Sequence, residues 1–302
     1  MLPFGLVTKG GWGSPHIEAD NIRFVAHHTS IPVPRILDAI EYRRDPTTPS
    51  GLIVMTRIEG ESLAQWISDH AIRPPGQQEL LEKLDHCISR GDMTGISETL
   101  AQLKPMPPPT LDLSDATLLI EDLRNAFREL RALPAPSAAV AGLLGRPLKC
   151  NRDGDLQFVG PFQDQQEFKD SLFAQANSVL SPHRMPALRR LAEPVNAKRH
   201  RVCFTHADLA ARNILVKNGR LSGIIDWEYS GWYPEYWELV TMERQMIDEP
   251  LMHQFWDAVQ LFGPEPYRDE LALEWALRHC TGASAAVCEQ EEDLSCPRCV
   301  VF

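Results

Sequence analysis

The spacing of hydrophobic side chains predicts that the first 60 residues form short strands around one helix. Glu18, Ile22 and Val25 recur at i, i+4 and i+7, which is the spacing of one helix face. Before this helix, alternating apolar and polar residues indicate a half-buried strand, which the run GGWGSP ends. The pattern therefore predicts, in order, a strand at 4–9, a helix at 16–29 and a proline-punctuated extended stretch at 30–44. The stretch 51–63 then begins with an apolar strand that ends at Gly60.

From Ser62 onward the periodicity of hydrophobic residues becomes mainly helical. Ser114 stands in an N-cap position before one apolar helical run, and Asp164 and Glu167 have the spacing of a capping box at the start of another. The chain is therefore expected to have an α+β fold, with a small strand-rich lobe and a larger, mainly helical lobe that carries a short hairpin. The expected helices of the larger lobe lie at 77–91, 96–103, 114–130, 164–180, 250–262 and 268–280.

The stretch FTHADLAARNILVKNGRLSGIIDWE contains a predicted β-hairpin. Its Asn-Gly pair at 218–219 is the strongest short signal for a two-residue turn, and apolar residues flank the pair on both sides. A two-residue turn places Val216 opposite Leu221 and Asn213 opposite Ile224. The hairpin thereby relates its polar side chains to one another in space.

Two oxygen-bearing side chains are expected on one face of this hairpin. Side chains alternate along a strand, so Asp226 shares the face of Ile224 and lies diagonally from Asn213, roughly 7 to 8 Å away at the backbone. An amide oxygen and a carboxylate at that separation can converge on one small cation, and hard oxygen ligands suit Mg²⁺. Asp208, in the loop after the apolar strand VCF, is left to hold an acceptor hydroxyl.

An alternative interpretation gives these side chains ordinary structural roles. Asp208 would then cap a turn, while Asn213 and Asp226 would each end a strand. We favour the functional interpretation, because the three residues occur together with His206 around one hairpin whose geometry relates them.

The motif HADLAARN followed by IIDWE resembles the catalytic and metal-binding loops of the aminoglycoside phosphotransferase and choline kinase group, which has a protein-kinase-like fold. The longer loops FTHADLAARNILV and GIIDWEYSGWYPEYWE are most similar to those of fungal aminoglycoside-phosphotransferase-like proteins. The resemblance extends through TSIPVPRILD, VMTRIEGESL and GPF at 160–162, and covers most of residues 6–245. It implies a bilobal fold with a nucleotide-binding lobe at 1–58 and a catalytic and substrate-binding lobe at 59–302.

By this resemblance, the protein is a small-molecule kinase that uses ATP and Mg²⁺. Asp208 would be the catalytic base that orients the acceptor hydroxyl, and Asn213 with Asp226 would hold Mg²⁺ on ATP. His206 would brace the catalytic loop by hydrogen bonding, and Glu238 would anchor that loop from below. Phosphoryl transfer depends mainly on positioning and charge neutralisation, which these residue types supply.

The resemblance also implies nucleotide-binding residues in the small lobe. Lys9 would hold the phosphates and pair with Glu18, because a carboxylate on a buried helix face needs a partner. Alternatively, Glu18 complements the helix N-terminus and Lys9 is solvated. The backbone of a hinge would meet the adenine, although the same residues also fit an ordinary buried strand. The hinge comprises Met55, Thr56, Arg57 and Ile58.

The small lobe is expected to be shortened relative to the resembled fold. That fold has two further strands and a phosphate-covering loop before the lysine strand, whereas eight residues precede Lys9 here. We therefore expect weakened ATP binding and an uncovered sheet edge through which two copies could form a homodimer. The missing strands also leave open a binding protein without phosphotransfer. Fold-level analogy alone leaves open non-kinase chemistry on a phosphorylated substrate at the same metal-carboxylate site.

Composition narrows the choice of ligand and compartment. A net charge of −11 and a pI near 5.4 disfavour nucleic-acid binding, which needs basic surface, and favour a polar or cationic small-molecule acceptor. No apolar run reaches about 18 residues and no secretory signal pattern is present, so we expect a cytoplasmic protein without a membrane span. Among the cysteines we expect free thiols in preference to a zinc site at the C-terminal cluster. That cluster is Cys280, Cys288, Cys296 and Cys299.

Overall fold

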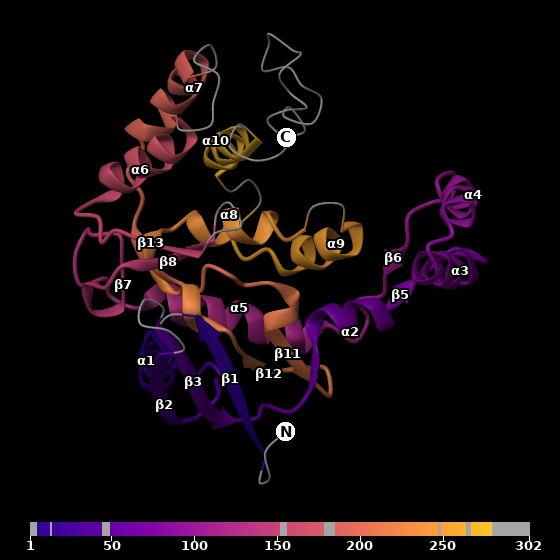
Figure 1. The fold of residues 1–302 in the computed structure, drawn as a ribbon, viewed down its shortest axis with the longest axis horizontal. Helices are drawn as coiled ribbons and strands as arrows, with labels where there is room; N and C mark the ends of the chain where they lie inside the picture. The colour runs from indigo at the N-terminus through magenta and orange to yellow at the C-terminus, as the bar shows by residue number, and fades with distance from the viewer. Residues whose placement is uncertain are drawn as a thin grey trace.

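The computed structural model describes the greater part of the chain as two lobes (Figure 1). The first strands and the first helix lie together at one end, and the mainly helical larger lobe fills the rest of the view. The predicted α+β class and two-lobed arrangement are confirmed. The described residues are 5–12, 14–43, 49–151, 156–177, 185–246, 249–263 and 267–279.

The small lobe consists of β1 (Leu6–Trp12), α1 (Pro15–His28), β2 (Ile36–Arg43) and β3 (Pro49–Thr56). Its strands form an antiparallel sheet in the order β1-β3-β2. Strand β1 is longer than predicted, because Gly10 and Gly11 continue its ladder with β3 instead of breaking it. Strand β3 ends at Thr56, earlier than the predicted Gly60. Within the described residues, no strand pairs with the outer edge of β1.

Helix α1 buries the face that its spacing predicted. Glu18, Ile22 and Val25 are all buried, and the two aliphatic residues join a hydrophobic core shared with the larger lobe. The buried Asn21 donates a hydrogen bond from Nδ2 to the backbone carbonyl of Trp227 at 2.8 Å. These contacts tie the small lobe to the segment that follows the predicted hairpin.

All six helices predicted for the larger lobe are present, together with α2, α7 and α8. Ser114 does not cap α5, whose N-cap residue is Ala116; the backbone N–H of Ser114 instead donates to Asp112. Asp164 accepts the N–H of Glu167 at 3.0 Å, as the capping-box spacing predicted. The helices are α2 (Leu63–Asp69), α3 (Gln77–Arg90), α4 (Met93–Leu103), α5 (Thr117–Ala132), α6 (Gln165–Asn177), α7 (Met185–Ala197), α8 (Trp237–Glu243), α9 (Pro250–Val259) and α10 (Arg268–His279).

Short antiparallel sheets connect these helices. Three strands pair in the order β10 (Val202–Thr205), β13 (Gly231–Pro234) and β7 (Ala141–Gly142). Three more pair in the order β12 (Arg220–Ile224), β11 (Ile214–Lys217) and β4 (Glu61–Ser62). Two ribbons join β5 (Ala71–Ile72) with β6 (Thr110–Leu111) and β8 (Leu148–Asn151) with β9 (Leu156–Val159). Short 3₁₀ turns lie at η1 (Leu143–Gly145), η2 (Ala211–Asn213) and η3 (Trp227–Tyr229).

The predicted hairpin is present as β11 and β12. Asn218 and Gly219 have positive φ angles of 53° and 69°, as a tight primed hairpin turn requires. Val216 lies opposite Leu221, as predicted. The local signal of the Asn-Gly pair therefore sets the turn correctly.

The predicted register fails further from the turn. Ile214, and not Asn213, lies opposite Ile224, because a β-bulge inserts Ser222 as an extra residue on β12. Asn213 consequently ends the η2 turn before the paired strand begins. The prediction that Asn213 faces Ile224 is wrong by one residue.

The linker between the lobes crosses the hairpin at this bulge and accounts for it. A Cβ on Gly223 would lie 2.4 Å from Cδ1 of Ile58, and a Cβ on Gly60 (φ 132°) would lie 2.5 Å from a carbonyl oxygen of β11. The N–H of Ile224 donates to the carbonyl of Pro32 at 2.9 Å. Contacts with distant segments therefore override the regular hairpin ladder.

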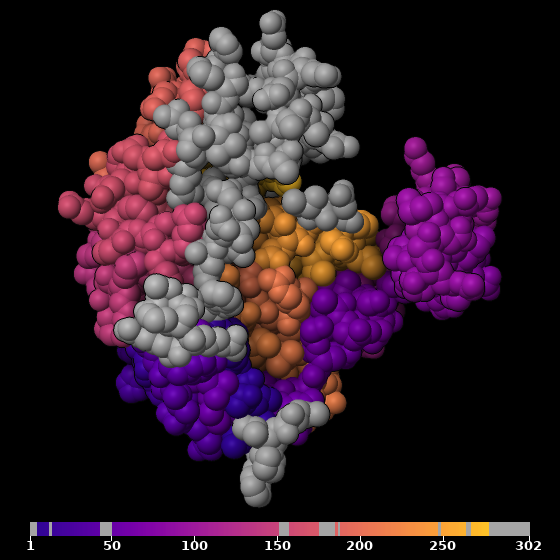
Figure 2. All heavy atoms as spheres, in the orientation of Figure 1, coloured from indigo at the N-terminus to yellow at the C-terminus, as the bar shows by residue number. Residues whose placement is uncertain are grey.

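Two hydrophobic cores stabilise the larger lobe. One packs α1, α2, α5, α9 and the hairpin around Phe204 and Trp227, and the other packs α6, α7, α8 and α10 around Phe168, Leu188 and Trp237. Helices α3 and α4 pair with each other and stand out from the body of the molecule as a separate knob (Figure 2).

No helix in the described part of the chain is long and apolar enough to cross a membrane. Cys87, Cys150 and Cys203 form no disulfide bond in the described part of the chain. The four C-terminal cysteines, for which free thiols were preferred to a zinc site, lie outside the described residues.

Candidate active site

The loop at 206–213, between β10 and β11, is held by two buried side chains. Glu238 in the first turn of α8 accepts hydrogen bonds from the backbone N–H of His206 at 2.7 Å and from the next N–H at 3.0 Å, which confirms its predicted anchoring position. The His206 ring donates from Nε2 to the carbonyl of Ile225 at 3.0 Å and accepts the N–H of Asp208 at Nδ1 at 3.2 Å. Both ring nitrogens thus bind backbone groups, as a bracing histidine requires.

Two non-glycine residues of this region have left-handed backbone conformations. Ala207 has a φ of 63°, and Asp226 has φ 68° and ψ 56°. Each such conformation costs about 1–3 kcal/mol and persists only where surrounding contacts hold it. Glu238 supplies such a contact at Ala207, and Lys9 supplies one at Asp226.

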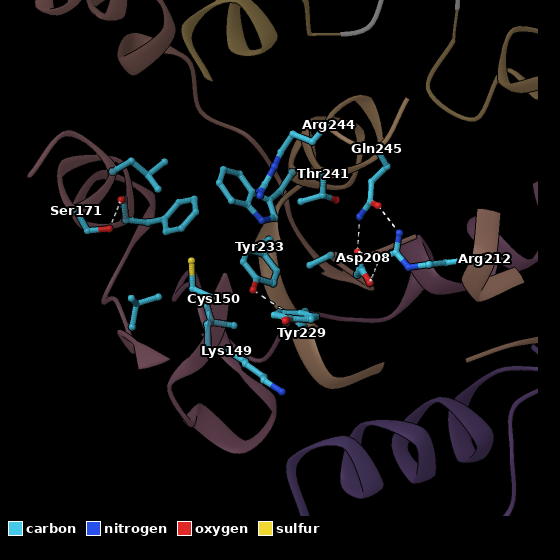
Figure 3. Close-up of a pocket in the computed structure, with 16 residues that line it drawn as sticks. Lys149, Cys150, Ser171, Asp208, Arg212, Tyr229, Tyr233, Thr241, Arg244 and Gln245 are labelled. Carbon is cyan, nitrogen blue, oxygen red and sulfur yellow. Dashed lines mark hydrogen bonds and ion pairs between the residues drawn. The ribbon is translucent and has the colours of Figure 1, made fainter. Parts of the chain in front are cut away.

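Asp208 lies at a cavity, where Arg212 and Gln245 contact its carboxylate (Figure 3). The carboxylate accepts hydrogen bonds from three side chains in all. Nη2 of Arg212 lies 3.0 Å and 2.9 Å from its two oxygens, Nδ2 of Asn213 lies 2.9 Å from Oδ2, and Gln245 donates to Oδ1. A buried carboxylate needs donors of this kind. The structure therefore places Asp208 in the predicted loop and surrounds it with donors.

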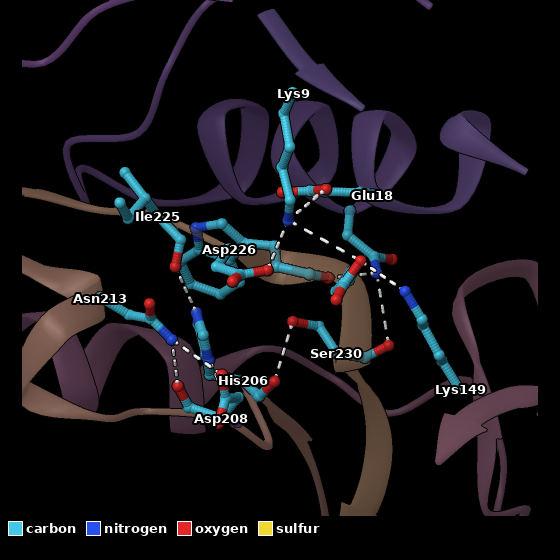
Figure 4. A network of polar contacts seen from close by, with 12 residues as sticks. Lys9, Glu18, Lys149, His206, Asp208, Asn213, Ile225, Asp226 and Ser230 are labelled. Atoms are coloured by element: carbon cyan, nitrogen blue, oxygen red, sulfur yellow. Dashed lines mark hydrogen bonds and ion pairs between the residues drawn. The ribbon is translucent and has the colours of Figure 1, made fainter. Parts of the chain in front are cut away.

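Asn213 and Asp226, which were predicted to share a cation, lie on two segments joined by one backbone contact. The carbonyl of Asn213 accepts the N–H of Ile225 at 2.9 Å. Between these two described side chains there is no hydrogen bond, because Asn213 binds Asp208 and Asp226 binds Lys9 (Figure 4). Their role as metal ligands stays a prediction.

Lys9 reaches from β1 into a group of carboxylates (Figure 4). Its Nζ lies 2.8 Å from Oε2 of Glu18, 2.6 Å from Oδ1 of Asp226 and 3.7 Å from Oε2 of Glu228. The predicted ion pair between Lys9 and Glu18 is confirmed, and the alternative of a solvated lysine is wrong.

Electrostatics keep this lysine charged. Burial lowers the pKa of Lys9, but the carboxylates of Glu18, Glu228 and Asp226 raise it, and the result is a pKa well above its usual range. Burial raises the pKa of Glu18 from its ordinary value of 4.5, and Lys9 opposes that change. Lys9 is therefore a permanent cation at neutral pH, and its charge is what makes the buried carboxylate tolerable.

The same three carboxylates form a candidate cation site. One oxygen from each of Glu18, Asp226 and Glu228 lies within 4.8 Å of the others. The ammonium of Lys9 contacts all three groups, and hard oxygen donors of this kind also suit Mg²⁺. Glu228 further contacts Nζ of Lys149 at 2.5 Å. The donor set thus fits a divalent cation, with Glu228 as a ligand that the sequence analysis did not propose.

The predicted hinge lies where the chain leaves β3 for the larger lobe. Met55 and Thr56 complete β3, and the N–H of Thr56 donates to the carbonyl of Arg35 at 3.0 Å. Arg57 follows the strand, and Ile58 lies against the hairpin. Their position suits a link between two lobes, and their contact with adenine stays a prediction.

The cavity beside Asp208, of about 220 Å³, has cationic and aromatic walls (Figure 3). Lys149, Arg212 and Arg244 line it, and Asp208 supplies the one carboxylate among the described residues of its lining. Arg212 is paired with Asp208 and Lys149 with Glu228, so each of these two cations already has a carboxylate partner. The aromatic walls are Phe168, Tyr229, Tyr233 and Trp237.

Sequence analysis missed four polar residues of this site. Arg212 and Glu228 lie within the quoted motif, and their charge was a usable signal that was not used. Gln245 and Lys149 carry no local signal, because they are 37 and 79 residues from their hydrogen-bond partners. Only the folded chain brings these two side chains to the site.

The chain is similar to one known protein family and to solved structures. The model of the family described as "Phosphotransferase enzyme family" matches residues 14–272. A thermostable mutant of aminoglycoside phosphotransferase APH(4)-Ia in its apo form superimposes with a TM-score of 0.51 and 16% identity, over 91% of this chain and 77% of that chain. A variant of that mutant in ternary complex with AMP-PNP and hygromycin B gives a TM-score of 0.54 and 13% identity, over 91% and 76%. No curated protein sequence gives a significant match.

Proposed function

The chain belongs to the phosphotransferase enzyme family, whose model matches most of its length, and from this premise we propose that it transfers a phosphoryl group from ATP, with Mg²⁺, to a hydroxyl group of a small molecule. One observation carries the proposal: Lys9, Glu18, Asp208 and Asp226 come from four separate segments and gather in one region (Figure 4). These are the residue types that phosphoryl transfer requires to hold phosphates, metal and acceptor. A structural neighbour in complex with AMP-PNP and hygromycin B supports the same class of reaction.

Asp208 would accept a hydrogen bond from the acceptor hydroxyl and take its proton as transfer proceeds. Its oxygens are already occupied by donors, so an acceptor must replace one of them. Arg212 and Gln245 are the replaceable contacts, because Arg212 is exposed and Gln245 is half-buried, whereas Asn213 is buried. Asn213 would meanwhile keep the carboxylate oriented.

The metal and the nucleotide phosphates would bind at the cluster formed by Lys9 and its neighbouring carboxylates. Asp226 and Asn213 are the proposed ligands of Mg²⁺, and Glu228 has a carboxylate oxygen within 4.8 Å of one of Asp226. Bound Mg²⁺ would supply neutralisation of the charge that develops on the phosphoryl oxygens. Lys9, a cation at neutral pH, would then bind phosphate oxygens in addition to Glu18.

We expect ATP to raise the melting temperature only when Mg²⁺ is present, and Asp226→Ala to abolish this increase. The physical reason is that a ligand that binds only the native state stabilises it, and the metal joins Asp226 to the nucleotide. At about 100 times the dissociation constant the increase should be on the order of 5 °C or more. Thermal unfolding with and without Mg²⁺ measures it.

Asp269→Ala is a matched control for that experiment. Asp269 lies on α10, and its carboxylate is 2.7 Å from Nζ of Lys198. It belongs neither to the carboxylate cluster around Lys9 nor to the lining of the Asp208 cavity. This variant should keep the full Mg²⁺-dependent increase. A full increase in Asp226→Ala would contradict the metal assignment.

The acceptor is expected to carry an apolar part beside its hydroxyl group. Aromatic side chains line the cavity in which Asp208 would orient the hydroxyl: Phe168, Tyr229, Tyr233 and Trp237. The aromatic walls would contact an apolar part of the acceptor. The polar or cationic acceptor favoured by the net charge of the chain stays a prediction.

Phosphoryl transfer to a panel of hydroxyl compounds tests this acceptor class. Compounds with an aromatic or aliphatic part beside the hydroxyl group should be better substrates than fully polar hydroxyl compounds, because the cavity has aromatic walls. Equal rates for both kinds of compound would contradict this role of the aromatic walls.

A further inference from the structure

A second cavity, of about 380 Å³, lies outside the candidate active site, between α5 and the segments that follow α9. Arg124, Arg128, Arg131 and Arg201 line it, with Glu235 as the one carboxylate among the described residues of the lining. Arg124 serves the fold, because it donates to two carbonyls at the end of α9 at 2.8 Å and 3.0 Å. Four arginines in one cavity are a strong local excess in a chain of net charge −11.

Arg131 is a buried cation without an anionic partner. It is 9% exposed, its Nη1 donates to Oγ1 of Thr205 at 3.2 Å, and its buried Nη2 has no hydrogen-bond partner among the described residues. The guanidinium lies 4.6 Å from the ring centre of Phe127. In the described part of the chain, no carboxylate lies within ion-pair distance of Arg131. Such a buried charge is unfavourable unless an anion joins it.

The other cations of the cavity leave this charge uncompensated. Arg128 donates to the neutral amide of Asn125 at 2.7 Å. Arg201 lies 3.8 Å from Glu235, and the same carboxylate lies 3.6 Å from Nδ1 of His200. Glu235 is therefore shared between Arg201 and His200, and it does not neutralise the arginines of α5.

The spacing of the arginines on α5 also indicates positive charge that an anion would compensate. Arg124, Arg128 and Arg131 stand at i, i+4 and i+7, so their side chains share one helix face and repel one another. A cation near the C-terminus of a helix is favourable, but an exposed side chain would serve that purpose without burial. A bound anion would relieve both the repulsion and the burial of Arg131.

Apolar and phenolic side chains complete the walls. Phe127 and Phe262 pack edge to face with ring centres 4.9 Å apart. Burial raises the pKa of Tyr267, and Arg131 and Arg201 both oppose that change, which places these two guanidiniums near one phenol group. The cavity therefore combines cationic donors with a wall able to pack against an apolar group.

We propose that this cavity binds a small multivalent oxyanion, such as a phosphate ester or a polycarboxylate, with Arg128, Arg131 and Arg201 as its cationic contacts. Planar guanidinium groups bind such oxyanions through pairs of parallel hydrogen bonds. Through Thr205, which directly precedes His206, Arg131 also connects the cavity to the loop at 206–213. This site is independent of the proposed phosphotransfer, so either can fail without the other.

Thermal unfolding of the full chain, without nucleotide or Mg²⁺, tests the proposal. Pyrophosphate and citrate are titrated separately against sodium chloride of equal ionic strength. We expect at least one of them to stabilise the protein saturably beyond chloride, and Arg131→Met to raise its apparent dissociation constant by about tenfold or more, because the buried donor is lost. A response to pyrophosphate alone assigns the site to phosphates, and a response to citrate alone assigns it to carboxylates.

Two further variants separate this cavity from other cationic positions. Arg90→Gln and Lys9→Met should both respond as the parent protein, because neither residue lines the cavity. A response that disappears in Lys9→Met and survives in Arg131→Met would place the anion at Lys9 and overturn the proposal. The proposal is also overturned if pyrophosphate and citrate stabilise the parent protein no more than chloride does. If Arg131→Met does not fold, the double variant Arg128→Gln, Arg201→Gln should show the same weakening, and an unchanged dissociation constant there would also overturn it.

Discussion

Asp208→Asn is expected to lower kcat by about 10²-fold or more while the dissociation constant for ATP stays within about threefold of the parent value. The substitution keeps the size of the side chain and removes the negative charge that orients the acceptor hydroxyl and takes its proton. Lys9 and Asp226 contact each other and not Asp208, so nucleotide binding should be preserved. Turnover of an acceptor found in the substrate panel and calorimetric titration with ATP measure the two quantities.

Asp122→Asn is the matched control for this substitution. Asp122 also accepts two hydrogen bonds from one arginine, at 2.6 Å and 2.8 Å from Arg220, but it lies outside the Asp208 cavity. Its kcat should stay within about threefold of the parent value. Equal loss of ATP binding in Asp208→Asn and Asp226→Ala would make Asp208 a structural residue. Unchanged turnover in Asp208→Asn would remove the proposed base and favour a binding protein.

Lys9→Met is expected to lower turnover by about 10²-fold, the scale of one lost electrostatic contact in a transition state. The same substitution should strengthen the binding of Mg²⁺ alone. Without the ammonium, the carboxylates of Glu18, Asp226 and Glu228 retain their proximity and lose the cation that contacts all three. The melting temperature without metal should therefore fall, and Mg²⁺ should restore more of it than it adds to the parent protein.

The loss of stability in Lys9→Met should depend on pH. Burial raises the pKa of Glu18 above 4.5 in the folded protein, and removal of Lys9 would raise it further. Where the pKa of a carboxyl group is higher in the folded than in the unfolded protein, the protein loses stability as the pH rises from the unfolded pKa through the folded pKa. The difference in melting temperature from the parent protein should thus grow as the pH rises above the ordinary Glu18 pKa of 4.5 and shrink as the pH falls toward it.

Lys169→Met is the control for removal of a buried lysine. Lys169 is buried, and its Nζ donates to the carbonyls of Val195 at 3.2 Å and Lys198 at 3.3 Å. This variant should change stability without any gain in the response to Mg²⁺. A response to Mg²⁺ in Lys9→Met no larger than in the parent protein would show that the three carboxylates do not act as a cation site.

Features that depend on neighbouring residues in the chain were predictable. The hairpin turn follows from the φ preferences of Asn218 and Gly219, and the buried face of α1 follows from helical periodicity. The placement of Asp208 in a loop after an apolar strand needed only the local pattern. The false N-cap at Ser114 shows the limit of such signals, because the competing contact with Asp112 starts the helix later.

Contacts between distant segments decided the details of the site. The bulge at Ser222 forms where Ile58 and Gly60 cross the hairpin, and no local feature of the Asn-Gly turn indicates it. Lys149 reaches Glu228 across 79 residues of sequence. The prediction of a single hairpin face for the metal ligands failed for this reason, since register beyond the turn depends on what packs against the strands.

By itself, the sequence determined the class of fold, the hairpin turn, the loop that carries Asp208 and, through its motifs, the family resemblance that the family model then confirmed. Only the tertiary structure decided the charge environment: Lys9 among three carboxylates, the cationic walls of the Asp208 cavity and Arg131 buried without an anionic partner in the described part of the chain. Turn and helix preferences act over a few residues and can be read locally. The strength of a charge interaction depends on distance through space and on burial, and neither follows from separation along the chain.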